Sequence, residues 1–592
     1  MSSEHDLLII NGKIFDGTGS EPFNADIGIN SDIITRIDSL ESNNCQNIID
    51  AAGKIVMPGL IDMYTHAERG LPYPELASSL PYLTQGVTTV LGGADGYGAW
   101  PIHSSFKKWT KHLISNGIGT NVGFMVGLGQ VRRQVMGLNQ DIPSVEQIED
   151  MKQRVLDAMN DGAIGISSGL VFAPDRYFDT ETIIDIVREV DRFGGIYHTH
   201  IRDEGDYLIQ AVKEAIEISS QTRVTTVITH FKSVYRRNWG KLREATDLIA
   251  KARLRGIPVY ADQYPFVHGG PVPLLPVDIF HDPKDEIEKR ARSISGIIHT
   301  LSTESQINLR NHLLGYSALP DEVSFWGDRP ELLQNSIADS LSRLMPVKED
   351  SLLAASSWFG THQGPGNPEL RSRFVSFFDD NHKDRQIIRT KVADYLEFYG
   401  GAENMLVYGT LRSDLEFLSL KEAALKLGQS ETESAIRLGL EGAMAIVVLH
   451  SEDDLEYAMQ KDFVATGSDG DYPYFGTSQG KLGVPQSVRS YATFATKLYN
   501  YAIKKKTISM AHAIRSSTSL PAKILGLNDR GVVFEGAKAD LVIFDKDKLK
   551  PKAELHNPHK YSEGISHVII NGHLVVSDAF PTYGLYGRVL GV

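Results

Sequence analysis

Histidine and aspartate side chains follow several short apolar runs of the 592-residue chain, at the points where those runs end. Imidazole and carboxylate groups are ligands that zinc accepts when no thiolate is available, and a carboxylate can also move a proton in catalysis. A lone histidine of this kind is more often a hydrogen-bonded cap residue, but several at one barrel mouth favour a metal site. The residues in question are Asp62, His66, Asp95, His200, His230 and Asp469.

The elements that must position these side chains are eight β-rich runs separated by helical patterns, as in the βα units of a parallel sheet. Eight parallel strands close into a (β/α)8 TIM-type barrel, whose working residues lie at the C-terminal ends of its strands. We therefore predict an α/β barrel with the polar residues gathered at one mouth. The runs end near His66, Gly92, Gly127, Gly165, His200, His230, Asp262 and Asp469.

The rest of the chain divides around this barrel, to which we assign residues 58–266 and 406–525. Residues 1–57 and 526–592 alternate short β-rich runs with turn signals, so we expect both chain ends to build one small β-sandwich, followed by a C-terminal tail. About 200 residues separate the seventh and eighth runs, far more than a βα connection needs. We therefore predict an inserted, largely helical domain over residues 267–405, between strands 7 and 8.

Composition argues against several classes of protein. Asp and Glu (74) outnumber Lys and Arg (60), and the net charge of −14 would repel a phosphate backbone, so we expect no nucleic-acid partner. No stretch reaches the roughly 18 apolar residues of a membrane span, and the acidic start lacks the features of a secretory signal. We therefore expect no membrane partner and a cytoplasmic location. The single cysteine, Cys45, excludes an intrachain disulfide and a multi-cysteine metal site. The oligomeric state stays open.

Motifs along nearly the whole chain, outside the insertion, resemble a known family. The run PGLIDMYTH at 58–66 resembles the amidohydrolase-superfamily signature PGxIDxHxH. Further motifs are similar to the N-acyl-D-amino-acid deacylases, or D-aminoacylases, which implies a barrel hydrolase that cleaves an amide bond other than a peptide bond with metal-activated water. These motifs are GAIGISSGL at 162–170, YHTHIRDE at 197–204, THFK at 229–232, YP at 264–265, GSDG at 467–470, TSLPAK at 518–523, EGAKADL at 535–541 and NPHKYSEG at 557–564.

The resemblance implies a metal centre. In that family zinc is held by a thiolate after the second strand and by histidines that end the fifth and sixth strands. His200 and His230 match these histidines, whereas Asp95 stands at the thiolate position. A carboxylate is an acceptable but harder zinc ligand, so affinity or metal preference is expected to differ. Near this centre we expect Arg202 and Glu204 to form an ion pair rather than to contact substrate.

A second metal position and a catalytic base are also implied by the resemblance. The first histidine of the HxH pair is Tyr64 here, and a phenol is a poor zinc ligand near neutral pH because its pKa is about 10. Only His66 and Asp469 are left for a second, weaker metal, so we expect one tightly bound zinc. Asp469 is the expected catalytic residue, which takes a proton from water and returns it to the leaving amine.

The substrate is expected to be a small N-acyl compound with a carboxylate. Lys232, Tyr264 and Arg489 occupy positions equivalent to the family's carboxylate-binding groups, and Arg489 can bond both carboxylate oxygens. Tyr64 at the barrel mouth either packs in the wall or orients water or substrate. The family's GLxYxP tyrosine is Phe172 here, so one hydroxyl donor is missing.

The leading hypothesis is therefore deacylation of an N-acyl-D-amino acid or a related amide. A second hypothesis keeps the fold and metal but changes the bond, to that of a lactone, a cyclic amide or a peptide-like metabolite. A third is a non-hydrolytic descendant that binds a ligand or joins an amide. The acyl group, the amino-acid side chain and the role of the insertion stay open.

Overall fold

The structure, a computed structural model, describes most of residues 5–592. The greater part of the predicted inserted domain, with the helical character expected for it, lies outside the described residues. Among the described residues, no helix has the length and apolar content needed to cross a membrane. The segments not described within this range are 41–44, 46, 73, 75, 101–103, 138–139, 173, 275–384, 409, 411, 441–442 and 472–487.

The centre of the described chain is an eight-stranded sheet whose neighbouring strands are all parallel. The first and last strands meet where the N–H of Met63 donates to the carbonyl oxygen of Thr466 at 3.1 Å, which brings the sheet close to full closure. The predicted barrel is confirmed. In chain order the strands are β6 (Leu60–Asp62), β8 (Val87–Gly92), β9 (Asn121–Gly127), β10 (Gly165–Gly169), β11 (Ile196–His200), β12 (Thr225–Ile228), β13 (Val259–Gln263) and β17 (Val464–Thr466).

One strand boundary differs from the prediction. Strand β10 begins at Gly165, whereas we expected the fourth run to end near that residue. Ile166 is the only large apolar residue of the strand GISSG, so its second half, residues 167–169, carries no apolar signal. A Cβ at Gly165 would lie 2.4 Å from the carbonyl oxygen of Ile196, so the close approach of β10 and β11 requires a glycine there.

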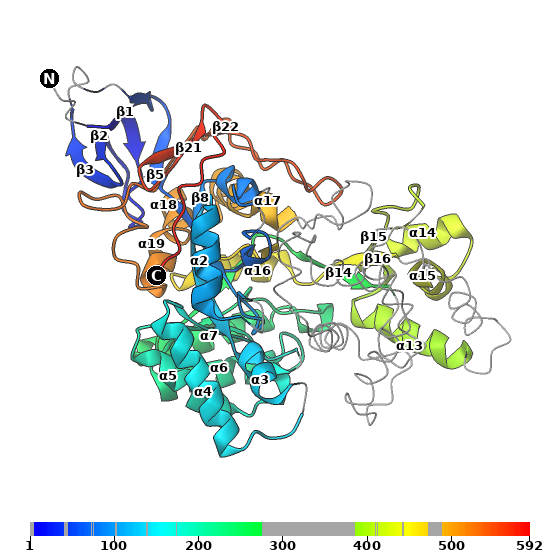
Figure 1. The fold of residues 1–592 in the computed structure, drawn as a ribbon. Coiled ribbons are helices and arrows are strands. Elements are labelled where there is room, and N and C mark those ends of the chain that lie inside the picture. Colours follow the sequence, from blue (N-terminus) through cyan, green and yellow to red (C-terminus); the bar gives the residue numbers. More distant parts are fainter. Residues whose placement is uncertain are drawn as a thin grey trace.

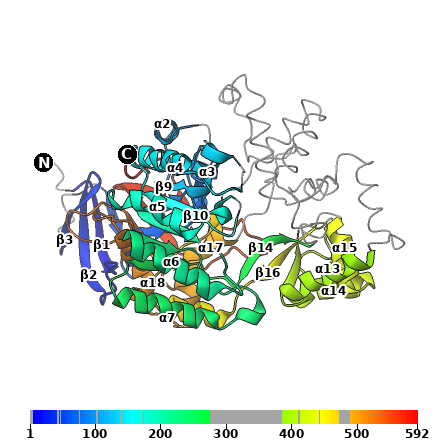
Figure 2. The same cartoon turned by 90° about the horizontal axis from the view of Figure 1, so that it is seen from below.

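Helices cover the outside of the barrel, and α4 to α7 lie side by side along it (Figures 1 and 2). In α5, Asp179 caps the N-terminus and apolar residues such as Ile183 and Val187 recur at helical spacing on the buried face. These helices are α1 (Leu80–Leu83), α2 (Phe106–Asn116), α3 (Leu128–Met136), α4 (Val145–Asn160), α5 (Thr180–Asp191), α6 (Leu208–Thr222), α7 (Lys241–Leu254), α16 (Glu452–Met459), α17 (Val488–Thr496) with its π-helical continuation η8 (Lys497–Lys504), α18 (Met510–Arg515) and α19 (Ser519–Ile524).

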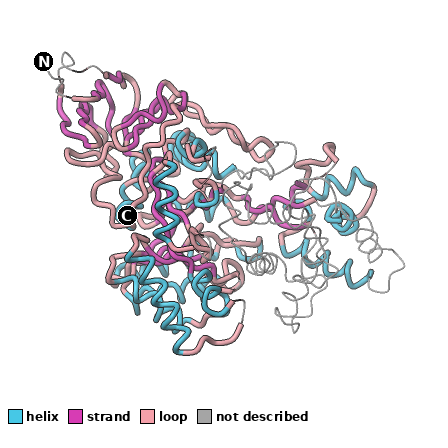
Figure 3. The backbone as a smooth tube through the Cα atoms, viewed as in Figure 1, coloured by secondary structure: helices cyan, strands magenta, loops and turns pink. Residues whose placement is uncertain are grey.

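The two chain ends form one nine-stranded sheet in the described part of the chain, as predicted (Figure 3). Strand β5 from the N-terminal segment pairs antiparallel with β19 from the C-terminal segment, with Val56 opposite Ile543. Apolar residues from both ends, including Ile27 and Ile569, share one core. The strands are β1 (Leu7–Ile14), β2 (Phe23–Asn30), β3 (Ile33–Asp38), β4 (Ile48–Asp50), β5 (Ile55–Pro58), β19 (Leu541–Phe544), β20 (Ile565–Ile570), β21 (His573–Ser577) and β22 (Phe580–Pro581).

The inserted segment has a small sheet of its own, on the side of the barrel away from the nine-stranded sheet in both ribbon views (Figures 1 and 2). We predicted its end at residue 405, but β16, which follows that residue, pairs with both β14 and β15, and residues of β15 and β16 share a separate apolar core with α13. The other domain limits stay predictions. The elements are β14 (His268–Pro273), α13 (Arg385–Phe398), β15 (Met405–Tyr408), α14 (Leu420–Leu427), α15 (Glu431–Leu440) and β16 (Met444–Val448).

Candidate active site

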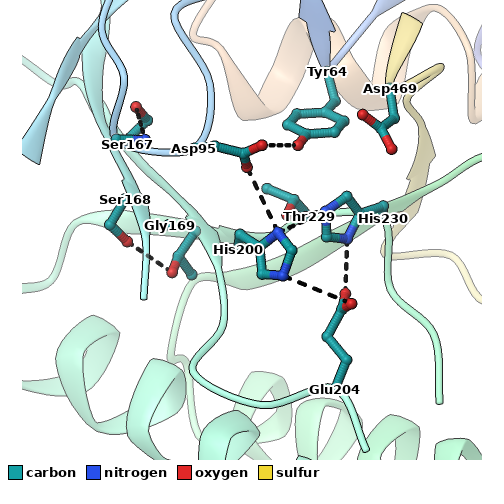
Figure 4. A network of polar contacts seen from close by, with 12 residues as sticks. Tyr64, Asp95, Ser167, Ser168, Gly169, His200, Glu204, Thr229, His230 and Asp469 are labelled. Atoms are coloured by element: carbon teal, nitrogen blue, oxygen red, sulfur yellow. Dashed lines mark hydrogen bonds and ion pairs between the residues drawn. The ribbon is translucent and has the colours of Figure 1, made fainter. Parts of the chain in front are cut away.

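Three of the predicted metal ligands meet at the mouth of the barrel (Figure 4). Asp95 follows β8, His200 ends β11 and His230 follows β12, and each offers one ligand atom within 4.8 Å of the others. His200 Nδ1 lies 3.0 Å from His230 Nε2 and 3.8 Å from Asp95 Oδ1. Three strands thus direct two imidazole nitrogens and one carboxylate oxygen at the same small volume.

The chemistry of this group fits a divalent cation. Asp95 Oδ1 is buried and has no hydrogen-bond partner among the described residues, which is costly unless a cation or a water completes it. Burial lowers the pKa of His200 to about 4, and burial together with the charge of Lys232 lowers the pKa of His230 well below its usual range. Both rings are therefore neutral near pH 7, with a nitrogen lone pair available for a metal.

The backbone at the site is held in an uncommon conformation. Asp95, His230 and Asp469 have φ angles of 56°, 32° and 50°, a region that costs non-glycine residues free energy. Buried carboxylates hold two of these turns. Asp262 Oδ1 accepts the N–H of His230 at 2.8 Å, and Asp62 Oδ1 accepts the N–H of Ser468, next to Asp469, at 2.8 Å. The fold thus holds the side chains in place at the expense of local strain.

Tyr64 and His66 both lie next to Asp95. The Tyr64 hydroxyl donates to Asp95 Oδ2 at 2.6 Å, and burial followed by the charges of Asp95 and Asp469 raises the pKa of this phenol well above its usual range. His66 Nε2 lies 3.7 Å from Asp95 Oδ2 and 3.8 Å from Asp469 Oδ1. His66 therefore adjoins the group Asp95, His200 and His230 without being part of it, and its role as a ligand stays a prediction.

Asp469 and Arg489 form a largely buried ion pair. Arg489 Nη1 lies 3.1 Å from Asp469 Oδ2, and the guanidinium stands 4.9 Å from the centre of the Tyr264 ring. Burial raises the pKa of Asp469 to about 6, even though Arg489 and His66 lower it. A carboxyl group with such a pKa exchanges protons readily near neutral pH.

Sequence reasoning missed the role of Glu204. We expected an ion pair with Arg202, but Arg202 Nη2 lies 2.8 Å from Glu214 instead. Glu204 Oε1 lies 2.6 Å from Lys232 Nζ and 2.8 Å from His230 Nδ1. Glu204 stands four residues after His200, on the loop that follows the strand, and this position beside a predicted ligand was the available signal.

A second buried pair, His198 and Asp262, contacts the backbone of His230. His198, to which we assigned no role, lies on β11 with Nε2 3.1 Å from Asp262 Oδ2. The other oxygen of Asp262 accepts the N–H of His230.

Phe172, at the position of the family's tyrosine, packs edge-on against the His200 ring with centroids 4.9 Å apart. It gives the site an apolar wall that is 37% exposed.

Comparison with known sequences agrees with these observations. The model of the amidohydrolase family matches residues 412–576. A D-aminoacylase of Alcaligenes xylosoxydans xylosoxydans is 33% identical over 287 residues, which cover 45% of this chain and 59% of that relative. An N-acyl-D-glutamate deacylase of the same organism is 25% identical over 100% of this chain and 97% of the relative.

Comparison with solved structures supports the fold. A crystal structure of D-aminoacylase superposes with a TM-score of 0.69 at 24% identity, over 99% of this chain and 100% of that one. An N-acyl-D-glutamate deacylase of Bordetella bronchiseptica, solved with zinc and a phosphonate inhibitor, gives 0.68 at 23% identity over the same shares. The shared barrel shows the fold, and the sequence motifs, the family model and the similarity to these deacylases show that this chain belongs to the amidohydrolase family.

Proposed function

We propose that this chain removes the acyl group from an N-acyl-D-amino acid or a closely related N-acyl compound. The observation that carries the proposal is the meeting of Asp95, His200 and His230 at the barrel mouth, with Asp469 and Arg489 beside them. Relatives named for deacylation of N-acyl-D-amino acids align along the length of the chain and support this substrate class.

Zinc is the cation that we propose for the site, held by Asp95 Oδ1, His200 Nδ1 and His230 Nε2. When bound, it supplies a positive charge that polarises the amide carbonyl and makes a water easier to deprotonate. The ligand residues themselves need little rearrangement, because two neutral imidazoles and one carboxylate oxygen already converge. Glu204 Oε1 and Lys232 Nζ each lie 2.8 Å from the outer ring nitrogen of His230, Nδ1. The carboxylate favours the tautomer that carries its proton on Nδ1 and leaves Nε2 free for a metal.

Asp469 is the residue that we propose as catalytic base and acid. Its carboxylate accepts a proton from the attacking water and then gives the same proton to the leaving amine. Burial, the main cause of its raised pKa, suits this double role, because the group is neither a very weak base nor permanently charged. Arg489 keeps one of its oxygens in place.

Arg489 and Tyr264 are the groups that we propose for holding the substrate's carboxylate. The planar guanidinium can bond both carboxylate oxygens, and the Tyr264 hydroxyl can donate a further hydrogen bond. Lys232 fits this role less well than the sequence suggested, because its ammonium group is buried against Glu204. We propose that Lys232 helps to position His230, whose Nδ1 lies 2.8 Å from Lys232 Nζ, in addition to any contact with substrate.

A second candidate is hydrolysis of a cyclic amide or a lactone. The pairing of Lys232 with Glu204 and the replacement of a tyrosine by Phe172 both reduce the donors that would face a free carboxylate. A substrate without that carboxylate is thus a reasonable alternative. The absence of nucleic-acid and membrane partners and a cytoplasmic location stay predictions from the sequence.

A substrate panel tests the proposal. Zinc-loaded protein is assayed by amine release on matched N-acetyl-D- and N-acetyl-L-amino acids, and by ring opening, measured as acid production, on a cyclic amide and a lactone. The proposal expects turnover of D-isomers with little turnover of the L-isomers. Turnover of the ring substrates alone would select the second candidate, and turnover of L-isomers at equal rates would reject the proposed selectivity.

A further inference from the structure

We propose that Tyr64 is a positioning residue of the metal centre: its hydroxyl holds one oxygen of Asp95, so that Asp95 gives a single oxygen to a single cation and cannot bridge to a second one. This inference rests on the proposed metal site and adds to it the number of ions that the site accepts.

The two oxygens of Asp95 have different environments. Oδ2 receives the Tyr64 hydroxyl at 2.6 Å, whereas Oδ1 has no hydrogen-bond partner among the described residues and lies 3.8 Å from His200 Nδ1. A protonated phenol is a hydrogen-bond donor near neutral pH. Its hydrogen therefore occupies Oδ2 and orients Oδ1 toward the imidazoles.

Tyr64 itself has little freedom to move away. The side chain is 1% exposed, and its ring lies between His66, His198 and His230 at centroid distances of 5.6, 5.4 and 5.1 Å. Its N–H donates to Asp62 Oδ1, and its carbonyl oxygen accepts the N–H of Asp469 at 2.8 Å. Packing and backbone bonds together fix the position of the hydroxyl.

A second cation would have to use the oxygen that Tyr64 occupies. The atoms around His66 Nε2 are Asp95 Oδ2 at 3.7 Å and Asp469 Oδ1 at 3.8 Å. Asp95 Oδ2 is therefore the atom that would bridge from the group Asp95, His200 and His230 to an ion at His66. Its bond to the Tyr64 hydroxyl competes with such a bridge, and Tyr64 does not replace a nitrogen ligand because a neutral phenol binds zinc poorly.

The two departures from the family's motif are thus physically coupled. Tyr64 stands where the HxH signature has a histidine, and Asp95 stands where the family has a thiolate. The new phenol contacts the new carboxylate directly. A carboxylate has two oxygens where a thiolate has one sulfur, and the phenol removes this ambiguity.

Metal titration of the full-length chain tests the inference. The protein is stripped with a chelator and titrated with zinc against a coloured competitor, without substrate. We expect one equivalent in the wild type, and we expect Tyr64→Phe to bind zinc about 10- to 100-fold more weakly, the usual effect of removing a group that orients a ligand. The matched control is Tyr197→Phe, which removes another buried hydroxyl, 2.7 Å from Ser168 and outside the metal site. The control should stay within about twofold of the wild type, because it orients no ligand.

A variant that should bind an additional zinc ion provides the second part of the test. Tyr64→His removes the donor and supplies a nitrogen, so this variant should bind two equivalents of zinc where the wild type binds one. Cobalt-substituted Tyr64→Phe should show weaker visible absorption bands than cobalt-substituted wild type, because Asp95 is then free to use both oxygens and raise the coordination number. Thermal melting of the metal-free variants shows whether each one is folded.

Several results would overturn the inference. They are two tightly bound zinc ions in the wild type, unchanged zinc affinity and cobalt bands in Tyr64→Phe, or a single zinc in folded Tyr64→His. The titration is independent of turnover. Failure of the N-acyl-amino-acid assay with one bound zinc would reject the proposed function alone, whereas turnover with two bound zinc ions would reject only the inference on Tyr64.

Discussion

Glu204 Oε1 lies 2.8 Å from His230 Nδ1, the ring nitrogen opposite the one that faces His200. The same oxygen lies 2.6 Å from Lys232 Nζ, which itself lies 2.8 Å from His230 Nδ1, so Glu204, Lys232 and His230 form one buried cluster. Carboxylates in this position fix the tautomer and the orientation of a ligating imidazole.

Glu204→Gln should therefore weaken metal binding about 10- to 100-fold, the usual effect of losing such a partner. Glu214→Gln is the matched control, because Glu214 pairs with Arg202 away from the three ligands. The measurement is zinc affinity by competition, with melting of the metal-free proteins alongside, since Lys232 loses its partner. Equal zinc affinity in folded Glu204→Gln and wild type would show that Glu204 does not orient His230.

Asp469→Asn should lower kcat by roughly 10²- to 10⁴-fold, the range expected for loss of a general acid–base group. Zinc should stay bound, since Asp469 is not one of the three converging ligands. Steady-state kinetics on the best substrate of the panel, together with metal analysis of the same preparation, give both values. Activity within about tenfold of the wild type would remove Asp469 from the role of base.

Phe172→Tyr should strengthen binding of substrates that carry a free carboxylate. The residue lies beside His200 and is partly exposed at the site, so a hydroxyl added there can donate to a substrate oxygen. We expect KM to fall about tenfold, which corresponds to one hydrogen bond to a charged group. An N-acyl amine without a carboxylate is the control substrate. An equal change for both substrates would show that the hydroxyl does not contact the carboxylate.

Lys497 gives the protein a stability that depends on pH. Burial lowers the pKa of this lysine to about 7, and its Nζ lies 2.7 Å from Thr466 Oγ1. Between pH 7 and the unfolded value of about 10.4, the unfolded chain binds a proton that the folded chain has released, so stability rises with pH across this window.

The Lys497→Met variant tests that dependence. It removes the titrating group, so the melting temperature of the wild type should rise relative to that of the variant from pH 7 to pH 9.5. The wild type should lose this added stability again when the pH returns to 7. A constant difference across these pH values would show that Lys497 is charged in the folded protein.

Most of the barrel could be predicted from the sequence because apolar β-rich runs mark buried parallel strands directly. His200 ends β11 and His230 follows β12, so the same pattern also pointed to two of the proposed ligands. The end of strand β10 was misplaced because the residues after Ile166 are small or polar. Gly165 is required by the close approach of the Ile196 backbone, and not by packing in the core.

The support of the site was harder to predict. Glu204 was assigned to Arg202 by proximity in the sequence, but a loop and a turn bring it to Lys232 instead. The hydrogen bond between Tyr64 and Asp95 joins residues 31 positions apart and depends on an uncommon φ at Asp95, which no residue pattern reveals. Contacts between side chains at the ends of different strands form only when the barrel closes, so they could not be predicted from the sequence.

The central claim is that Asp95, His200 and His230 hold one cation, and anomalous diffraction at the zinc edge from zinc-loaded crystals tests it most directly. The account predicts one strong peak about 2.0–2.2 Å from Asp95 Oδ1, His200 Nδ1 and His230 Nε2. Density without a peak there, or a peak on other side chains in protein shown by metal analysis to contain zinc, would contradict it.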